Sequence, residues 1–419
     1  MTPEAPAPNR SWRQPAVLTA ALLSVAAGFA QFGPAAALAD VAAEFGDVAV
    51  DPETVEQLAL SGTVIGIGLS IIRFASLGSL AIAGAADVFG RRRVLLFSCA
   101  AGLMLTALTA LSPSYWAFVA IFALGRPFLS ATNAVAGVTA AEYTDTKNRA
   151  AAIVLIATGY AIGTGITLIA RWAGGEGLGF RGLFGLAIVP VLLLPFAARK
   201  LRETRYFTEL PAEQRPAALG RVPRPWVPRL LLLCVLTSGI GLITGPANTY
   251  VFIYGEQYLG LSIGALTLAG LSTGPLGLVG LLLGRWGADR LGRRVSAALA
   301  MVVAGAGGIL LYSGPVEALL AGYLLTIAGQ AAYAAPAGAL DAELFRTSFR
   351  ATVAGWLTVA GVLGASLGLL AFGFLWDQVG PATTAWLLFT PAALAGPLYF
   401  LLPETRGREL EDDEVAGRP

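Results

Sequence analysis

The sequence DVFGRRR at residues 87–93 recurs as DRLGRR at residues 289–294. Each copy places the pattern Asp-x-x-Gly-Arg-Arg between the end of one long apolar run and the start of the next. The two aspartates lie 202 positions apart (289 − 87), close to half of the 419 residues. One such match would mean little in a chain with many arginines, so the inference of a repeat depends on further motifs with the same spacing.

Two further motifs keep this spacing. Glu142 and Arg149 recur 201 positions later as Glu343 and Arg350. The segment LRETR at residues 201–205 recurs as LPETR, again 201 positions later. Three different motifs that repeat in register predict a duplicated chain with two halves of the same architecture.

The composition is that of a membrane protein. Mean hydropathy is +0.70 and only 13% of residues are charged, whereas soluble domains average about a quarter. The charges are bunched, and the apolar runs between them approach the ~20 residues that a helix needs to span a bilayer. Twelve such runs fall near residues 16–39, 56–86, 94–111, 115–140, 150–171, 182–199, 228–254, 262–287, 295–312, 316–340, 351–376 and 384–402.

The predicted fold class is therefore an all-α polytopic membrane protein with twelve transmembrane helices in two pseudo-symmetric six-helix bundles. The distribution of Lys and Arg predicts cytoplasmic termini, because the loops on the other side then hold only Arg171 and Arg181 and the charges of residues 40–56 are all acidic. We expect a multi-pass protein of a bacterial inner membrane. The expected divisions are residues 1–199 for the first bundle, 200–227 for a cytoplasmic linker, 228–402 for the second bundle and 403–419 for a cytoplasmic tail.

Several classes of protein are disfavoured. The chain has no histidine, which removes the commonest metal ligand and proton relay. Cys99 and Cys234 both lie in apolar runs, so we expect free thiols. No nucleophile–base pair, metal cluster or phosphate-binding loop is visible. We expect no enzymatic activity, no cofactor, no metal and no nucleic-acid partner, and we expect a monomer in the lipid bilayer.

The motifs resemble those of the major facilitator superfamily over nearly the whole chain. The resemblance rests on the Asp-x-x-Gly-Arg-Arg loops after spans 2 and 8, on Arg126 followed by Glu142, and on LPETRGREL at residues 402–410. It is nearest to the sugar-porter and metabolite:proton symporter branches. Ala83 and Val88 depart from the usual loop pattern, and span 5 lacks the Gly-Pro pair typical of drug antiporters.

That resemblance implies secondary transport by alternating access, with the loop motifs taking part in gating. Asp87 lies at a helix end, where it can accept hydrogen bonds from a helix N-terminus or an arginine, and Gly90 allows a sharp turn. The alternative is that the arginines only fix topology. The candidate gating residues are Asp87, Gly90, Arg91, Arg92, Glu142, Arg149, Asp289, Gly292, Arg293, Arg294, Glu343 and Arg350.

Arg73 and Arg126 are the basic residues well inside predicted spans. An arginine at that depth is costly unless it faces water, protein or an anion. Their counterparts in the second half are Gly274 and Ile327, an asymmetry that indicates function. Arg126 belongs to the family motif, so a structural or coupling role is as open as substrate contact. The candidate substrate-binding residues, chosen for depth and polarity, are Arg73, Arg126, Gln31, Asn133, Gln330, Tyr333, Asn248 and Tyr160.

Every Asp and Glu falls at or beyond the end of a predicted span. Proton symport would then use Asp40, Glu56 or Glu142, or a proton carried on the substrate, and uniport and anion exchange stay open. The favoured function is a secondary transporter of a small polar solute, an organic anion or carboxylate ahead of a sugar-like metabolite. The alternatives are a drug or metabolite efflux antiporter and a non-transporting sensor on the same scaffold.

Overall fold

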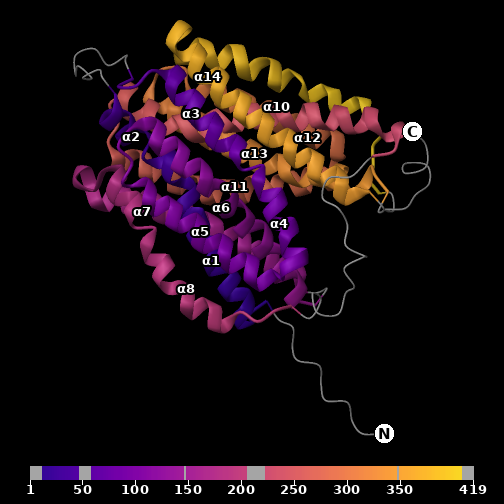
Figure 1. Ribbon diagram of the computed structural model, residues 1–419. Helices are drawn as coiled ribbons and strands as arrows, with labels where there is room; N and C mark the ends of the chain where they lie inside the picture. Colours follow the sequence, from indigo (N-terminus) through magenta and orange to yellow (C-terminus); the bar gives the residue numbers. More distant parts are fainter. Residues whose placement is uncertain (1–11, 47–57, 146–147, 205–221, 347–348, 408–419) are drawn as a thin grey trace.

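The computed structural model describes residues 12–46, 58–145, 148–204, 222–346 and 349–407. Helices make up these segments, and no β-strand is found among them. Figure 1 shows the first-half helices, in indigo to magenta, mainly on one side of the molecule and the second-half helices, in pink to yellow, mainly on the other. Helices α8 and α14 lie at opposite outer edges.

The described residues of the first half form eight helical segments. Their bounds are α1 (Pro15–Ala36), α2 (Leu38–Phe45), α3 (Gly62–Ala75), α4 (Gly78–Phe89), α5 (Arg91–Thr109), α6 (Tyr115–Tyr143), α7 (Arg149–Gly185) and α8 (Ile188–Lys200). The predicted second span is therefore broken into α3 and α4 at Ser76 and Leu77. Helix α7 is two crossings in one, because Gly175 (φ 57°) and Gly179 (φ 50°) interrupt its helical backbone.

The second half repeats this order. Its elements are η2 (Arg224–Trp226), α10 (Val227–Ile253), the π-helical turn η3 (Tyr254–Tyr258), α11 (Ile263–Arg290), α12 (Arg293–Leu311), α13 (Val316–Glu343), α14 (Arg350–Leu394) and η4 (Gly396–Leu401). Helix α14 has 45 residues, more than twice the ~20 that one crossing needs. Its backbone breaks at Gly380 (φ 75°).

Eleven apolar helical segments within the described residues are long enough to cross a membrane, and the last, Thr352–Leu401, has 50 residues and the Gly380 break. Counting it as two crossings gives the twelve that the sequence predicts. The repeat is also seen in the helix bounds: α6 and α13 begin 201 residues apart (316 − 115), and α5 and α12 begin 202 apart (293 − 91). The all-helical, twelve-crossing fold class is confirmed.

Two ends of the bundle are distinguished by their charged residues. We call the end with the two Asp-x-x-Gly-Arg-Arg loops (87–93 and 289–294) the signature end. The other end, where Asp40, Arg171, Glu256 and Asp377 lie, is called the far end.

The two halves pack closely toward the far end. One cluster of buried apolar side chains includes members of both halves, and in it Ile65 and Leu69 of α3 lie with Tyr250 of α10. Helices α3 and α14 approach so closely that a Cβ on Gly373 would lie 2.1 Å from the Gly62 carbonyl oxygen. Small residues allow this backbone approach in a membrane helix pair, so the far end is closed by packing.

Candidate functional site

At the signature end, the three repeated motifs of the first half form one cluster. The Arg91 guanidinium lies 2.6 Å from Asp87 and 3.1 Å from Glu142. The carboxylate of Glu203, from the LRETR segment, accepts a 2.9 Å hydrogen bond from the backbone N–H of Arg91 at the start of α5. A carboxylate at a helix N-terminus satisfies free N–H groups and is attracted by the helix dipole.

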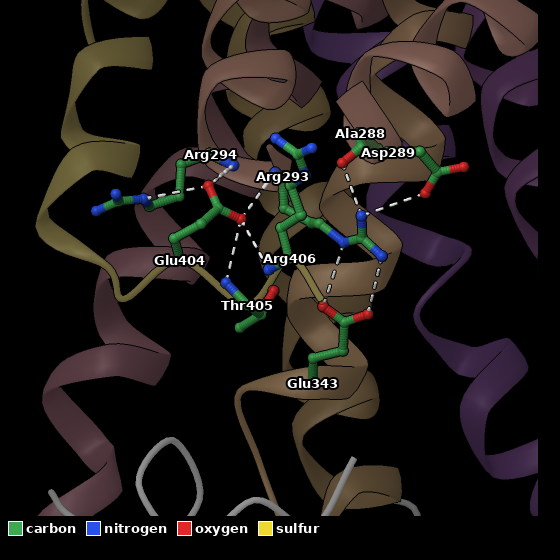
Figure 2. Close-up of polar contacts among 8 residues, drawn as sticks. All are labelled: Ala288, Asp289, Arg293, Arg294, Glu343, Glu404, Thr405 and Arg406. Carbon is green, nitrogen blue, oxygen red and sulfur yellow. Dashed lines mark hydrogen bonds and ion pairs between the residues drawn. The ribbon is translucent and has the colours of Figure 1, made fainter. Parts of the chain in front are cut away.

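The second half builds the same cluster (Figure 2). Arg293 lies 3.3 Å from Asp289 and 3.4 Å from Glu343. Its backbone N–H donates a 2.9 Å hydrogen bond to Glu404 of the LPETR segment. Motifs that are far apart in the sequence are therefore repeated because they contact one another at equivalent positions of the two halves.

The Glu404 carboxylate is held ionised by its surroundings. Burial raises its pKa, but the backbone N–H groups that donate hydrogen bonds to it outweigh burial and bring the pKa below its usual value. Those donors are the N–H groups of Arg293, Arg406, Arg294 and Thr405. The charge at the start of α12 is therefore permanent near neutral pH.

The ion pairs and hydrogen bonds given above for the two clusters join described residues of the same half. Arg92 donates to the carbonyls of Leu201 and Ala198, also in its own half. Arg350 donates to the Phe345 carbonyl. Arg149 is exposed at the start of α7 and, within the described part of the chain, makes no ion pair with Glu142. The predicted gating residues thus form two separate clusters in this conformation.

Gly292→Ala is expected to lower the melting temperature of the purified protein. Gly292 has φ 105° and ψ 157°. In this region of backbone conformation, a residue other than glycine costs about 1–3 kcal/mol. A Cβ there would also lie 2.6 Å from the Glu404 carboxylate. The matched control is Gly338→Ala, inside α13, where the added Cβ would have no neighbour within 4 Å. This variant should have an unchanged or higher melting temperature. Equal melting temperatures for the two variants would contradict this interpretation.

Between the two halves lies a cavity of about 580 Å³. Its lining comes from both halves and includes six of the eight predicted substrate-binding residues, which are Gln31, Arg73, Arg126, Tyr160, Asn248 and Gln330. A second space of about 600 Å³ shares Arg73, Thr244 and Gln330 with the first and reaches Asp341. Because Asp341 stands two residues before Glu343 of the signature cluster, the cavity extends toward the signature end.

The two cavity arginines have unused hydrogen-bond donors. Arg126 is 8% exposed and donates from Nη1 to the Gln31 carbonyl at 3.0 Å. The buried Nε atoms of Arg73 and Arg126 have no hydrogen-bond partner within the described residues. The two guanidinium charges act on each other electrostatically, and no carboxylate is among the described residues that line the 580 Å³ cavity. Two cations that no carboxylate of this cavity neutralises are suited to an anionic group.

Amide and hydroxyl groups surround the arginines. Gln31 donates from Nε2 to the Leu129 carbonyl at 3.0 Å, which ties α1 to α6. Asn248 donates from Nδ2 to Gln330 Oε1 at 3.0 Å, and its own Oδ1 is buried without a described partner. The cavity therefore offers hydrogen-bonding groups from both halves around a basic side.

Two predicted substrate-binding residues lie elsewhere. Asn133 is absent from the described cavity linings, because its Oδ1 accepts a 2.7 Å hydrogen bond from Ser24 and holds α6 against α1. Tyr333 is 9% exposed and lines only the space toward the signature end. Its hydroxyl is hydrogen-bonded to that of Tyr399.

The expectation that every Asp and Glu lies at or beyond the end of a span needs correction. Asp341 lies inside α13, which continues to Glu343, and its side chain lines the cavity. The predicted span ended at residue 340, so this acidic residue was counted as lying beyond a span. Of the carboxylates expected to carry a proton, Glu142 and Asp40 are paired with arginines, and Glu56 lies outside the described residues.

The far end is closed by polar contacts between the halves. Arg171 of α7 is 3% exposed and is hydrogen-bonded to Asp40 of α2 and to Glu256 of η3 in the other half. Asp377 of α14 accepts hydrogen bonds of 2.8 and 2.9 Å from the backbone N–H groups of Gly62 and Thr63 at the start of α3. Sequence reasoning did not find these contacts.

The comparisons with known proteins agree with this architecture. The family model described as Major Facilitator Superfamily matches residues 18–288 and 267–419. The cis,cis-muconate transport protein of Acinetobacter baylyi is 28% identical over 343 residues, covering 73% of this chain and 79% of that protein. The probable 4-methylmuconolactone transporter of Cupriavidus pinatubonensis is 25% identical over 341 residues, covering 78% of each chain.

Among solved structures, the inward-open conformation of the xylose transporter XylE from E. coli is similar to this chain. The TM-score is 0.74, and the match covers 95% of this chain and 98% of that one. With 16% sequence identity, this likeness concerns the fold alone.

Proposed function

Because this chain belongs to the Major Facilitator Superfamily of membrane transporters, we propose that it carries a small organic anion, with one or two carboxylate groups, by alternating access. The single observation that carries the proposal is the pair of arginines in the cavity, Arg73 and Arg126, each with a buried Nε that lacks a partner within the described residues. A carboxylate can accept two parallel hydrogen bonds from a guanidinium group, which replaces the hydration that the arginine loses.

The relatives support the same substrate class. Their names assign cis,cis-muconate, a dicarboxylate, and 4-methylmuconolactone to transport. The cavity of about 580 Å³ is of a size that holds small-molecule ligands. An organic cation would meet two positive charges and no carboxylate among the described lining of that cavity, and its entry would be opposed by repulsion.

In this proposal Arg73 and Arg126 bind the anion. Gln31, Tyr160, Asn248 and Gln330 orient it through hydrogen bonds. Asn133 and Tyr333 have positioning roles, because their polar atoms are engaged with Ser24 and Tyr399.

The orientation in the membrane is also proposed. The positive-inside rule supports a cytoplasmic signature end, with both termini cytoplasmic, in a bacterial inner membrane. The cavity then opens inward while Arg171, Glu256 and Asp377 hold the outer side closed. The divisions that follow are two bundles at residues 1–199 and 228–402, a linker at 200–227 and a tail at 403–419, in a monomeric transporter.

Gating follows from the two charged ends. We propose that the outer contacts separate when the signature end closes, so that a substrate reaches the cavity from one side at a time. The signature clusters, including Asp87 and Asp289, then stabilise the ends of the helices that must approach each other. Arg149 is exposed and available for such an approach.

A thermal-shift screen of the purified protein tests the substrate class. A ligand that binds the folded state raises the melting temperature by mass action. We expect a concentration-dependent rise with cis,cis-muconate and related carboxylates, and none with matched concentrations of neutral sugars or organic cations. Selective stabilisation by an amphipathic cation would contradict the proposal and favour an efflux antiporter.

A further inference from the structure

We propose that Asp341 is the proton-binding residue that couples anion movement to the proton gradient. The proposal rests on the proposed function, since it assigns the ion that accompanies the anion. It takes the place of the two routes considered for proton symport, a proton on Asp40, Glu56 or Glu142 and a proton carried on the substrate.

The first argument comes from the duplicated sequence. The charges of the signature clusters are present in both halves: Glu142 corresponds to Glu343, and Arg91 to Arg293. Asp341 instead corresponds to Ala140, 201 positions earlier, although α6 and α13 begin at equivalent residues. A carboxylate present in one copy and absent from the other is not required by the scaffold that both halves share.

The same asymmetry applies to the arginines. Arg73 and Arg126 correspond to Gly274 and Ile327 in the second half. The described residues that line the cavity and its extension include two guanidinium groups and one carboxyl group, and those belong to Arg73, Arg126 and Asp341. None of the three has a charged counterpart in the other half, so the charges of the cavity are not part of the architecture that the two halves share.

The second argument comes from the surroundings of the carboxylate. Within the described part of the chain, Asp341 has no ion pair or hydrogen bond to its side chain, in contrast to Glu142, Glu343 and Glu404. The α14 residues that line its side of the cavity are mostly apolar, among them Ala354 and Leu357. An unpaired carboxylate against such walls is stabilised by taking up a proton.

Three described groups interact electrostatically with this carboxyl group. They are the Cys234 thiol of α10, the Tyr333 hydroxyl on its own helix and the Tyr399 hydroxyl of η4. Arg73 of α3 lines the same space and supplies its positive charge. A proton on Asp341 therefore changes the charge of a cavity whose remaining ionised lining residues, within the described chain, are the two arginines.

The coupling step is a simple proton transfer. When the cavity opens outward, one carboxylate oxygen of Asp341 binds a proton from the outer solution, and the neutral acid lets the two arginines hold the anion. When the cavity opens toward the signature end, the O–H bond breaks and the proton leaves to the cytoplasm. The resulting carboxylate competes for Arg73 and repels the bound anion, so release of the proton and of the anion favour each other.

A reconstituted transport assay separates coupling from binding. Proteoliposomes that contain Asp341→Asn should exchange internal for external labelled cis,cis-muconate close to the wild-type rate, while accumulation driven by a pH gradient should be lost. Asp341→Glu should recover accumulation. The matched control is Glu317→Gln, an exposed carboxylate on the same helix, which should accumulate muconate as the wild type does. Gradient-driven accumulation by Asp341→Asn at the wild-type level would overturn the proposal.

A second measurement does not depend on the substrate. The infrared carboxyl band of the purified wild type, recorded during a pH titration, should contain a component that is missing in Asp341→Asn and present in Glu317→Gln. If the wild type neither binds nor moves muconate while this component is found, the proposed substrate fails and proton binding at Asp341 stands. If the wild type and Asp341→Asn titrate identically, the proton-binding role is wrong, whatever the substrate.

Discussion

Arg73→Gln is expected to abolish uptake of the anion while leaving the protein folded. Glutamine keeps a hydrogen-bond donor on a shorter side chain but loses the charge and the planar fork that matches a carboxylate. Hydrogen bonds to a charged group contribute about 1.5–3 kcal/mol, so affinity should fall by roughly tenfold to a hundredfold for each one lost. Arg73→Lys keeps the charge and loses the fork, and should show weakened binding with some transport.

Stability distinguishes this role from a structural one. The Arg73 Nε is buried without a described partner, so removal of the charge should leave the melting temperature equal or higher. Arg285→Gln is the matched control, because this arginine is exposed on α11 and lines none of the described cavities. A large loss of melting temperature in Arg73→Gln, with ligand affinity retained in the folded fraction, would show that the arginine only supports the fold.

Arg171→Gln is expected to open the far end. In the structure this arginine is 3% exposed and neutralises Asp40 and Glu256, which belong to different halves. Without the guanidinium the two carboxylates repel each other in a buried site, and loss of one partner from a buried ion pair costs about 3–5 kcal/mol. A change of that size moves a two-state equilibrium by roughly a hundredfold or more, so the outward-open population should rise.

The opening can be measured as a distance between spin labels. Leu111→Cys at the end of α5 and Ser262→Cys at the start of α11 place exposed labels at the far end of each half, in a background without Cys99 and Cys234. The label distance should lengthen in Arg171→Gln. Glu44→Gln, which breaks an exposed ion pair with Arg181 and leaves Arg181 in place, should leave the distance unchanged because such pairs contribute little. A folded Arg171→Gln protein with the wild-type distance would show that Arg171 does not hold the far end closed.

The repeat and the hydropathy pattern were sufficient to predict the architecture. Charges that must contact one another to cap α5 and α12 are repeated in register, so the LRETR and LPETR segments could be related to the loop motifs before their contact was known. Arg73 and Arg126 were identified because a charged side chain within an apolar run is expensive and therefore stands out.

The carboxylates of the cavity and far end were harder to identify, for a physical reason. A span predicted from hydropathy ends at its first charge, whereas the helices continue past Asp341 and Asp377, and the π-helical turn that carries Glu256 follows α10 directly. The partner of such a charge also lies on another helix: Arg171 and Glu256 are 85 residues apart. Periodicity identifies the face of a helix but not its neighbour, which is why Asn133 was expected in the cavity and instead contacts Ser24.

The hydropathy pattern also did not predict the breaks within spans. Helices α3 and α4 are separated at Ser76 and Leu77 without a proline, and the Ser76 hydroxyl donates to the Arg73 carbonyl at 2.6 Å. This break lies one turn from the arginine that lines the cavity. Apolar residues continue through it, so the run at residues 56–86 reads as one span.

Calorimetric titration of the purified protein with cis,cis-muconate and with its neutral dimethyl ester tests the central claim most directly. The two ligands share a carbon skeleton and differ in charge, so the comparison isolates the contribution of the Arg73 and Arg126 guanidinium groups. We predict saturable binding of the diacid, loss of that binding in Arg73→Gln, and no measurable binding of the ester. Equal affinity for the acid and the ester, or wild-type affinity for the acid in Arg73→Gln, would contradict an anion site built on these two arginines.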